Sequence, residues 1–422
     1  MKTHTAPHPG LAAGVTTCVE CRICGVADLL PVLDLHEQAV GNAFRQPGGT
    51  DPLRAPLQLV RCASCSFVQL AHIVDSEVMY SSYWYRSGIN HTMRRHLEGL
   101  AEQAIRIAGV RAGDTVIDIG CNDGTTLACY PESVHRIGVD PSNIQPEGCD
   151  VHIHDYFSHN AVAAALNGGR AKVITSIAMF YDLNEPRPFV EDVRRCLADD
   201  GVWIVELSYL PAMLKAVSYD TICHEHVGYY RIKTFESVLD GTDLEVFDVE
   251  FNECNGGSFR LFTAPRGTRQ KTERYVAAKF DEFRQLFDTA VPYTAFEKRV
   301  EHAGRELRAF LENANRDGKV VYGYGASTKG MVTLQYCGVT PDHIVAIAER
   351  NPDKFGLLCP GTDIPICSEA EMRAASPDYL VVLPWHFLTE FLEREQDYLA
   401  AGGKLVVPMP DFAIHSADEA LA

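Results

Sequence analysis

The sequence predicts an α/β protein with a small cysteine-bearing module followed by two parallel-sheet domains. Two Cys-x-x-Cys pairs occur within the first 65 residues. An apolar strand that runs into a glycine turn occurs twice, in DTVIDIGCNDG at 114–124 and in KVVYGYGASTKG at 319–330. From these landmarks we expect a disordered tail at 1–17, the cysteine module at 18–75, a first sheet domain at 76–265, a helical connector at 266–318 and a second sheet domain at 319–422.

The composition narrows the class of protein. The chain has 422 residues, more than one ordinary hydrophobic core organises. Its 46% hydrophobic and 22% charged residues are typical of a soluble globular protein, and no apolar run is long enough to cross a bilayer. A net charge of −18 disfavours a nucleic-acid partner. The N-terminal residues lack the apolar core of a secretion signal, so we expect a cytoplasmic protein whose 14 cysteines bind metal more readily than they form disulfides.

Two cysteine pairs have the spacing of zinc knuckles: Cys21 with Cys24 in CRICG, and Cys62 with Cys65 in RCASC. Each pair presents two thiolates from one tight turn, and two turns complete a tetrahedral four-sulfur site. Cys18 offers a competing pair with Cys21, but Gly25 favours the later pair because a knuckle needs a turn residue after it. A closed four-cysteine site has no open position for chemistry, so we predict a structural Zn²⁺.

The segment that leads out of this module is dense in aromatic residues. Either the rings pack a domain interface, or a tyrosine hydroxyl reaches a ligand, for which Tyr83 is our candidate. The two interpretations are about equally supported. After it, apolar residues at helical spacing from Ser87 to Gly109 predict a helix that enters the next domain.

The 114–124 stretch predicts a strand, a tight glycine turn and a helix that begins near Thr125. Gly120 and Gly124 would let the backbone approach a ligand closely. Such a turn alone also fits a dinucleotide-binding fold. Two acids favour S-adenosylmethionine instead. Asp118 precedes the turn, near the donor's amino-acid end, and Asp140 ends the next strand, where it would accept both ribose hydroxyls.

A third element, HIHDYF, brings an acid to the place where the adenine amino group would lie. The cofactor-binding candidates are Asp118, Gly120, Asn122, Gly124, Asp140, Asp155 and Phe157. The order and spacing of these elements resemble the class I methyltransferase fold, which is Rossmann-like.

Two later apolar segments, 171–183 and 199–210, predict further strands of the same sheet. In such sheets the ligand crevice lies outside the carboxyl ends of the strands, so Tyr181 and Glu206 would face it. NGGSFRLF at 255–262 predicts a turn and an edge strand that return to the same region.

The stretch YDTICHEHVGYY at 219–230 is dense in proton-transfer groups, which are costly to bury without a purpose. It follows the last donor-side strand, so we expect it to close over the acceptor side of the crevice. The donor site would supply an electrophile, and this stretch would supply the base.

The second glycine turn precedes a predicted helix that carries Ser327, Thr328 and Lys329. Backbone amides at a helix start, together with hydroxyls and a lysine, form a phosphate site. With Tyr324 at the strand end, these residues are our candidates for binding a substrate diphosphate. The turn would alternatively hold a nicotinamide cofactor, for which Glu349 is the only candidate ribose acid, and we favour the diphosphate.

Six motifs occur in the order found in zinc-containing sugar-nucleotide C-methyltransferases: CRICG, RCASC, DIGCNDG, ICHEH, NGGSFR and YGASTKG. The resemblance runs from about residue 20 to 415. It implies a zinc-binding domain, a central methyltransferase domain, and a Rossmann-like C-terminal domain that helps to hold a nucleotide diphosphate. Such enzymes use S-adenosylmethionine to methylate nucleotide-linked 4-keto-deoxysugars in branched-deoxysugar biosynthesis.

The family's Glu-His pair matches Glu225 and His226, which makes His226 the candidate base. Two positions depart from the family pattern. Cys223 stands where some members have a tyrosine, and Tyr181 where some have a histidine. In the resemblance both face the sugar, so the sugar and the methylated carbon can differ from those of better-known members.

Carbon methylation requires that a proton leaves a carbon next to the ketone, C3 or C5, with the charge stored as an enolate. A neutral imidazole suits the base, Glu225 would orient His226 or stabilise its charged form, and His224 with nearby tyrosine hydroxyls would stabilise the enolate oxygen.

Two alternatives stay open: an epimerase or isomerase that uses the same enolate, and a zinc-ribbon nucleic-acid methyltransferase, which the acidic balance disfavours. We expect a sugar-nucleotide partner and neither nucleic acid nor membrane. The sequence does not fix an oligomeric state, and a monomer is compatible with it.

Overall fold

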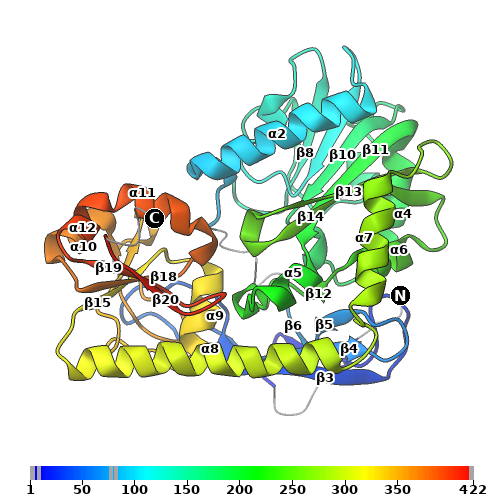
Figure 1. Cartoon of the computed structure of the whole chain (residues 1–422). Helices are drawn as coiled ribbons and strands as arrows, with labels where there is room; N and C mark the ends of the chain where they lie inside the picture. The colour runs from blue at the N-terminus through cyan, green and yellow to red at the C-terminus, as the bar shows by residue number, and fades with distance from the viewer. Residues whose placement is uncertain (1–4, 7–10, 76–78, 80–83, 418–422) are drawn as a thin grey trace.

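The computed structural model describes residues 5–6, 11–75, 79 and 84–417 and arranges them in four β-sheets (Figure 1). Two small antiparallel sheets form the N-terminal part, in the orders β1-β2-β6 and β12-β5-β4-β3. Their strands are β1 (Thr5–Ala6), β2 (Val15–Cys18), β3 (Leu29–Ala39), β4 (Arg54–Cys62), β5 (Val68–Leu70), β6 (His72–Val74) and β12 (Gly228–Tyr229).

Strand β12 comes from the 219–230 stretch, far from its sheet partners in sequence. Gly228 pairs with Gln69 and Tyr229 with Val68. The ring of Phe67 packs on that of Tyr230, with centroids 5.0 Å apart. The residues just after the proton-transfer groups therefore form a strand of the N-terminal sheet, although they lie about 160 residues away from it in the sequence.

The central sheet has seven strands in the order β13-β14-β11-β10-β7-β8-β9. The strands are β7 (Thr115–Ile119), β8 (His135–Val139), β9 (Val151–Ile153), β10 (Ala171–Ile177), β11 (Leu197–Ser208), β13 (Leu244–Asn252) and β14 (Ser258–Pro265). The first five are parallel, and β14 runs antiparallel to both neighbours. The prediction of an edge strand at 255–262 is wrong. β14 is an inner strand, buried along its whole length, and β13 forms the edge.

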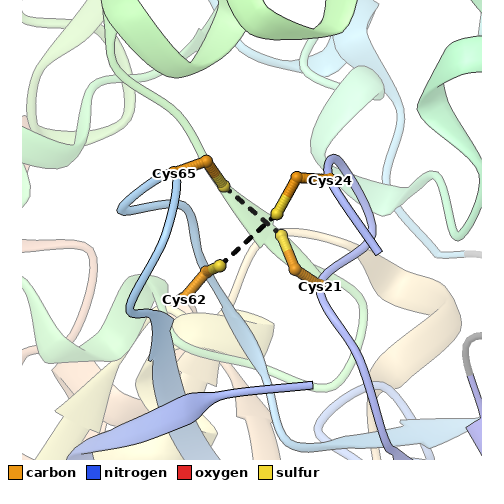
Figure 2. A group of neighbouring side chains, drawn as sticks. All are labelled: Cys21, Cys24, Cys62 and Cys65. Atoms are coloured by element: carbon orange, nitrogen blue, oxygen red, sulfur yellow. Dashed lines mark hydrogen bonds between the residues drawn. The ribbon is translucent and has the colours of Figure 1, made fainter. Parts of the chain in front are cut away.

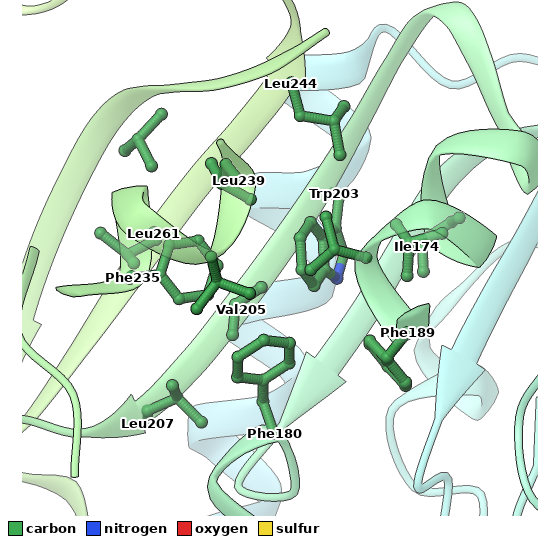
Figure 3. Packing of buried hydrophobic residues seen from close by; sticks show 14 of the residues in the cluster. Ile174, Phe180, Phe189, Trp203, Val205, Leu207, Phe235, Leu239, Leu244 and Leu261 are labelled. Atoms are coloured by element: carbon green, nitrogen blue, oxygen red, sulfur yellow. The ribbon is translucent and has the colours of Figure 1, made fainter. Parts of the chain in front are cut away.

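Alternating side chains on these strands bury both faces of the sheet. Val116, Val202 and Ile204 pack with α2, whereas the neighbouring Ile117 and Trp203 pack with α4 and α6. The helices around this sheet are α2 (His91–Ala108), α3 (His159–Val162), α4 (Pro186–Cys196), α5 (Leu210–Lys215), α6 (Ile232–Leu239) and α7 (Glu273–Arg284). Figure 3 shows the aromatic centre of the second face, where Phe180, Trp203 and Phe235 lie with ring centroids 5.3 to 5.8 Å apart.

The helix expected at 87–109 is confirmed as α2. Asn90 caps it, since its Oδ1 accepts from Thr92 N at 2.7 Å, and Gly109 ends it at φ 65°. The helix expected near Thr125 is wrong, because only a short 3₁₀ turn forms at Leu127–Cys129. Pro131 follows one residue later, and a proline disfavours helical geometry in the residue before it, here Tyr130, which is extended.

The C-terminal sheet has six strands in the order β17-β16-β15-β18-β19-β20. Its strands are β15 (Val321–Tyr324), β16 (Ile347–Glu349), β17 (Ile366–Ser368), β18 (Tyr379–Val382), β19 (Lys404–Val407) and β20 (Ala413–His415), of which only the last is antiparallel. Its helices are α9 (Thr328–Tyr336), α10 (Glu369–Ala375), α11 (Leu388–Arg394) and α12 (Gln396–Ala400). Both sheet domains thus have the parallel α/β architecture that the two glycine turns predicted.

One long helix, α8 (Val291–Arg316), runs beneath both the N-terminal sheet and the C-terminal domain (Figure 1). Its buried Phe296 and Val300 share a core with Leu35 of β3 and with Val332 of α9. The Gln335 amide of α9 also bonds both ways to the backbone of Ala39, at 2.8 and 3.1 Å. These contacts fix the N-terminal and C-terminal parts against each other. Among the residues that the structure describes, no helix is long and apolar enough to cross a membrane.

Candidate active site

The four predicted metal ligands come together at one point (Figure 2). The Sγ atoms of Cys21 and Cys65, and those of Cys24 and Cys62, are 3.5 Å apart, and all four atoms lie within 4.8 Å of one another. A tetrahedral zinc ion with Zn–S bonds of about 2.3 Å requires sulfurs about 3.8 Å apart, so the donor set fits Zn²⁺. Cys18 lies outside this group, which confirms the choice of the later pair.

The zinc knuckle also contacts the proton-transfer stretch. Arg22, between the first two ligands, is 2% exposed, and its Nη1 donates to the carbonyl of Val227 at 3.1 Å. Leu70 N donates to the same carbonyl at 3.0 Å. The metal site therefore holds the backbone at the residue that follows His226.

A cavity of about 660 Å³ opens between the N-terminal part, the central sheet and the C-terminal domain. Its wall includes fourteen of the predicted site residues: Asp118, Gly120, Asn122, Asp140, Asp155, Phe157, Tyr181, Cys223, Glu225, His226, Tyr324, Ser327, Thr328 and Lys329. Gly124 and His224 are not part of the wall, and Tyr83 lies outside the described residues. One hollow thus contains the donor-side turn, the proton-transfer stretch and the second glycine turn.

The donor side is built on the carboxyl ends of β7 and β8. Asp118 is 3% exposed and its Oδ1 accepts from Thr175 Oγ1 at 2.5 Å. Burial raises the pKa of Asp118 to about 7, although the hydrogen bonds from the side chains of Thr175 and Thr126 lower it. Asp140 accepts the backbone N–H of Asn122 and of Ser142, each at 2.8 Å, so it fixes the glycine turn as well as facing the cavity.

The two glycines of this turn have different roles. Gly120 lines the cavity at φ 75°. Gly124, at φ 80°, faces protein instead, because a Cβ there would lie 1.9 Å from the carbonyl oxygen of Glu147. The expectation that Gly124 leaves room for the cofactor is therefore corrected: it leaves room for the chain's own backbone.

Gly124→Ala should consequently prevent the turn from closing. We expect a loss of stability of at least about 3 kcal/mol, since backbone at 1.9 Å cannot yield as a side chain does. Gly113→Ala is the matched control, because Gly113 also has positive φ, 87°, but no atom within 4 Å of its Cβ position. That variant should lose only about 1–2 kcal/mol. Urea unfolding of both variants measures the difference, and equal losses would contradict this assignment.

Asn122 holds the chain that covers the donor turn. Its Oδ1 accepts from Ser87 N and its Nδ2 donates to Tyr85 O, both at 3.0 Å. Farther out, Asp155 is exposed, and Phe157 packs on Phe189 with centroids 5.1 Å apart. An acid and an aromatic ring therefore stand at the outer end of the donor side.

His226 is oriented by a backbone carbonyl. Its Nδ1 lies 2.8 Å from Thr221 O, and since a carbonyl only accepts, Nδ1 carries the hydrogen and Nε2 carries the lone pair. The ring packs on Tyr181, with centroids 4.1 Å apart. Burial first, and then the positive charge of Lys329, lower the pKa of His226 to about 3. The imidazole is thus neutral at physiological pH, as a base must be.

Glu225 differs from its expected role beside His226. Its Oε1 is buried without a hydrogen-bond partner, so Thr221 rather than Glu225 orients the imidazole. Burial raises the pKa of Glu225 to about 7, and the charge of Lys354 opposes that rise. A carboxyl group with this pKa exchanges a proton readily near neutral pH.

His224 is a correction to the predicted catalytic set. It is 4% exposed and its Nε2 lies 3.1 Å from Ala55 O, in the N-terminal sheet. His224 lies in a turn closed by the bond from His226 N to Cys223 O at 3.1 Å, and it is absent from the cavity wall that Cys223 and Glu225 line. Burial lowers the pKa of His224 to about 4, and it raises the pKa of the Cys223 thiol well above its usual value.

On the C-terminal side, Ser327 caps α9 by accepting from Gly330 N at 3.1 Å. Lys329 Nζ donates to Asn255 O at 2.8 Å, which joins α9 to the central domain. The hydroxyl of Tyr324 donates to Glu395 Oε1 and accepts from Arg394 Nη2, both at 2.6 Å. That hydroxyl is already engaged, which leaves its ring rather than its oxygen for a ligand.

The cavity wall also contains charged and titratable residues that the sequence did not indicate, among them Lys354 and His386. Lys354 is 9% exposed, donates to Ala326 O at 2.8 Å and lies 4.5 Å from the ring centre of Phe44. His386 has a buried Nδ1 without a hydrogen-bond partner. Its position just after β18, at a strand's carboxyl end, is the signal that could have found it. No motif announces Lys354.

Two other acids are held by protein groups. Glu206 accepts from Arg260 Nε at 2.8 Å and lies 2.5 Å from His96 Nε2. Glu349, the candidate ribose acid for a nicotinamide cofactor, accepts the backbone N–H of Ala326 and Asn351 at 2.9 and 3.0 Å. The network around Glu349 favours a structural role at the β16 end over recognition of a ribose.

Models of known families match three consecutive parts of the chain. A "Putative zinc binding domain" matches residues 21–80, a "Methyltransferase domain" matches 89–249, and a "C-methyltransferase C-terminal domain" matches 253–410. The chain is also similar to the C-methyltransferase NovU of Streptomyces niveus, with 29% identity over 412 residues, which cover 95% of this chain and 98% of that protein.

Likenesses to solved structures are remote. An S-adenosylmethionine-dependent methyltransferase from Clostridium acetobutylicum has 10% identity and a TM-score of 0.30, over 41% of this chain and 92% of that one. The magnesium protoporphyrin IX methyltransferase of Synechocystis has 11% identity and a TM-score of 0.30, over 43% and 87%. Similarities this remote carry no argument about the site. The family is shown instead by the three family models, the cysteine cluster and the near full-length similarity to NovU. The chain belongs to the zinc-containing, S-adenosylmethionine-dependent C-methyltransferases.

Proposed function

We propose that this enzyme methylates a carbon next to the ketone of a nucleotide-linked 4-keto-deoxysugar, in the cytoplasm, through an enolate. The observation that carries the proposal is the state of His226. Its Nδ1–H is bonded to Thr221 O, so Nε2 offers a lone pair on the wall of the cavity shared by the donor turn and α9. A site of this kind suits an acceptor carbon that must first lose a proton.

When bound, S-adenosylmethionine supplies an electrophilic methyl group. Asp118 and Gly120 would hold its amino-acid end, Asp140 its ribose, and Asp155 with Phe157 its adenine, all of which line the same cavity. His226 Nε2 would take the proton from the sugar carbon. That carbon would then act as the nucleophile for the methyl group, whose bond to the donor's sulfur would break as the new C–C bond forms. Base and donor would therefore have to face the same cavity.

Glu225 and Lys329 would stabilise negative charge on the substrate, Glu225 at the ketone oxygen and Lys329 at the diphosphate. With a pKa of about 7 and a partnerless Oε1, Glu225 is suited to hold a proton against the ketone oxygen as negative charge develops there. Ser327, Thr328 and Lys329 at the start of α9 would hold the diphosphate, since a helix N-terminus with hydroxyls and a cation favours phosphate. Cys223 and Tyr181 would contact the sugar.

Incubation with S-adenosylmethionine and a dTDP-4-keto-6-deoxysugar tests the proposal. Mass spectrometry should detect the gain of one methyl group on the sugar, and NMR should place it on a carbon beside the ketone. The epimerase or isomerase alternative predicts deuterium uptake from D₂O with inversion and no methyl gain. Methylation of an oxygen or nitrogen, or of a nucleic acid alone, would disprove the proposed acceptor.

Donor affinity should depend on pH because of Asp118. Its pKa of about 7 means that it is ionised above neutrality and protonated below it. Only the ionised form attracts the donor's ammonium group, so the Kd for S-adenosylmethionine should rise by about tenfold as the pH falls from about 8 to about 6. Asp118→Asn should bind weakly with no such slope. Isothermal titration calorimetry measures both, and a flat Kd in the wild type would refute this role of Asp118.

A further inference from the structure

The base depends on a short turn that precedes it. Thr221, whose carbonyl accepts from His226 Nδ1, ends the 3₁₀ turn η4 (Tyr219–Thr221). The three residues of η4 are at most 2% exposed. Because the imidazole is held through this carbonyl, a shift of η4 would turn Nε2 away from its aim into the cavity.

The C-terminal domain holds η4 from outside. Trp385, in the 3₁₀ turn η7 (Trp385–Phe387) that follows β18, donates its indole N–H to Asp220 Oδ2 at 2.9 Å. Asp220 is 1% exposed, and its Oδ1 has no hydrogen-bond partner. The neighbouring Tyr219 packs edge-on against Tyr336 of α9, with centroids 5.3 Å apart. A turn of the central domain is thus anchored by two elements of another domain.

The same anchoring elements belong to the second glycine turn. Pro384, directly before Trp385, packs against Gly325 so closely that a Cβ on Gly325 would lie 2.8 Å from the proline ring. Gly256 packs in the same way against the indole of Trp385, since a Cβ on Gly256 would lie 3.0 Å from that ring. The preceding residue, Asn255, accepts from Lys329 Nζ at 2.8 Å. The glycine turn, the indole and η4 therefore form one packed unit.

Electrostatics around Asp220 agrees with this arrangement. Burial raises the pKa of Asp220, and the charge of Lys329 is the largest influence that lowers it again. Lys329 is also the charge that lowers the pKa of His226. One lysine of α9 thus acts on both the anchor of η4 and the base.

We propose that Trp385 and Asp220 are positioning residues for His226, and that through them the C-terminal domain sets the orientation of the base. The inference rests on the proposed function, since it takes His226 as the base. Neither residue would touch the reacting carbon. Their hydrogen bond keeps Thr221 O in place, so that Nε2 is aimed correctly when the diphosphate is held at α9.

Four variants test this. Asp220→Leu and Trp385→Phe each remove the hydrogen bond, whereas Asp220→Asn keeps an oxygen that accepts from the indole. We expect kcat to fall by about 10- to 100-fold in the first two, because small misplacements of a catalytic group have effects of this size. KM for sugar nucleotide and donor should stay within about threefold, and Asp220→Asn should retain most of kcat. The double variant Asp220→Leu/Trp385→Phe should be no worse than either single one.

Arg299→Ala is the matched control. Arg299 of α8 donates to Leu214 O and Lys215 O at 3.2 and 2.8 Å, another contact between domains, but one that holds the end of α5 and no residue of η4. It should leave kcat unchanged. Thermal unfolding and zinc content establish that each variant is folded, and if Asp220→Leu does not fold, Trp385→Phe and Asp220→Asn decide.

An unchanged kcat in Trp385→Phe, or effects of the two single variants that simply multiply, would overturn the positioning role. A rise in KM with kcat retained would do so as well, because it would assign the pair to binding. Activity of His226→Asn is measured alongside. If that variant is fully active the proposed function itself fails, whereas an inactive His226→Asn beside a normal Trp385→Phe removes only the positioning role.

Discussion

Replacing His226 with asparagine should lower kcat for sugar methylation by about 10²- to 10⁴-fold, the usual contribution of a general base. The amide can still accept a hydrogen bond, but it cannot take up the proton that Nε2 would remove. KM for the donor should change little, because the donor-side residues stand on other strands. Single-turnover kinetics with saturating donor and sugar nucleotide measure the effect.

His224→Asn is the matched control for this experiment. It makes the same substitution two residues earlier, at a histidine that bonds to Ala55 O and does not line the cavity. We expect it to lower the unfolding temperature, because a buried hydrogen bond is altered, and to leave kcat within about threefold of the wild type. A larger kinetic loss in His224→Asn than in His226→Asn would reverse the assignment.

Removal of the zinc ion should be the most damaging change to the fold of the N-terminal part. Cys62→Ser removes a ligand at the end of β4, next to the strand that pairs with β12. Without the metal, the knuckle that carries Arg22 loses its closure, and with it the bond to Val227 O. We expect loss of bound zinc, a stability loss of at least about 3 kcal/mol, and a fall in kcat from the loosened chain around His226.

Cys18→Ser provides the control, since Cys18 is a buried cysteine close in sequence that does not join the four-sulfur group. It should keep one zinc ion per chain and near-normal activity. Zinc analysis, near-UV circular dichroism and kcat are measured on both variants. Retention of zinc and full activity in Cys62→Ser would show that this cysteine is not a ligand.

Local patterns predicted the parts of the site that depend on neighbouring residues. A strand followed by a glycine turn is determined within about ten residues, so the sequence indicated correctly that Asp118 and Gly120 lie at a cavity. The zinc ligands were found for the same reason, because each pair shares one turn. The order of the six motifs along the chain then indicated the family, whereas the spacing within any one motif did not.

Tertiary contacts explain what the sequence could not predict. The space at Gly124 is filled by Glu147, more than twenty residues on, and no local pattern announces that contact. His224 and His226 look equivalent in sequence, but His224 bonds to Ala55 O of the N-terminal sheet, whereas His226 bonds to Thr221 O and lines the cavity. Lys354 lines the cavity and Trp385 bonds to Asp220, both from the C-terminal domain, so these contacts exist only once separate parts of the chain are assembled.

The most direct test of the central claim is proton removal by His226. The wild-type enzyme and His226→Asn are each incubated in D₂O with a dTDP-4-keto-6-deoxysugar, with and without S-adenosylmethionine, and deuterium at each sugar carbon is followed by NMR. The wild type should introduce deuterium at a single carbon beside the ketone, the same carbon that gains the methyl group when donor is present. His226→Asn should be at least about 100-fold slower. Exchange by His226→Asn at the wild-type rate would contradict the account.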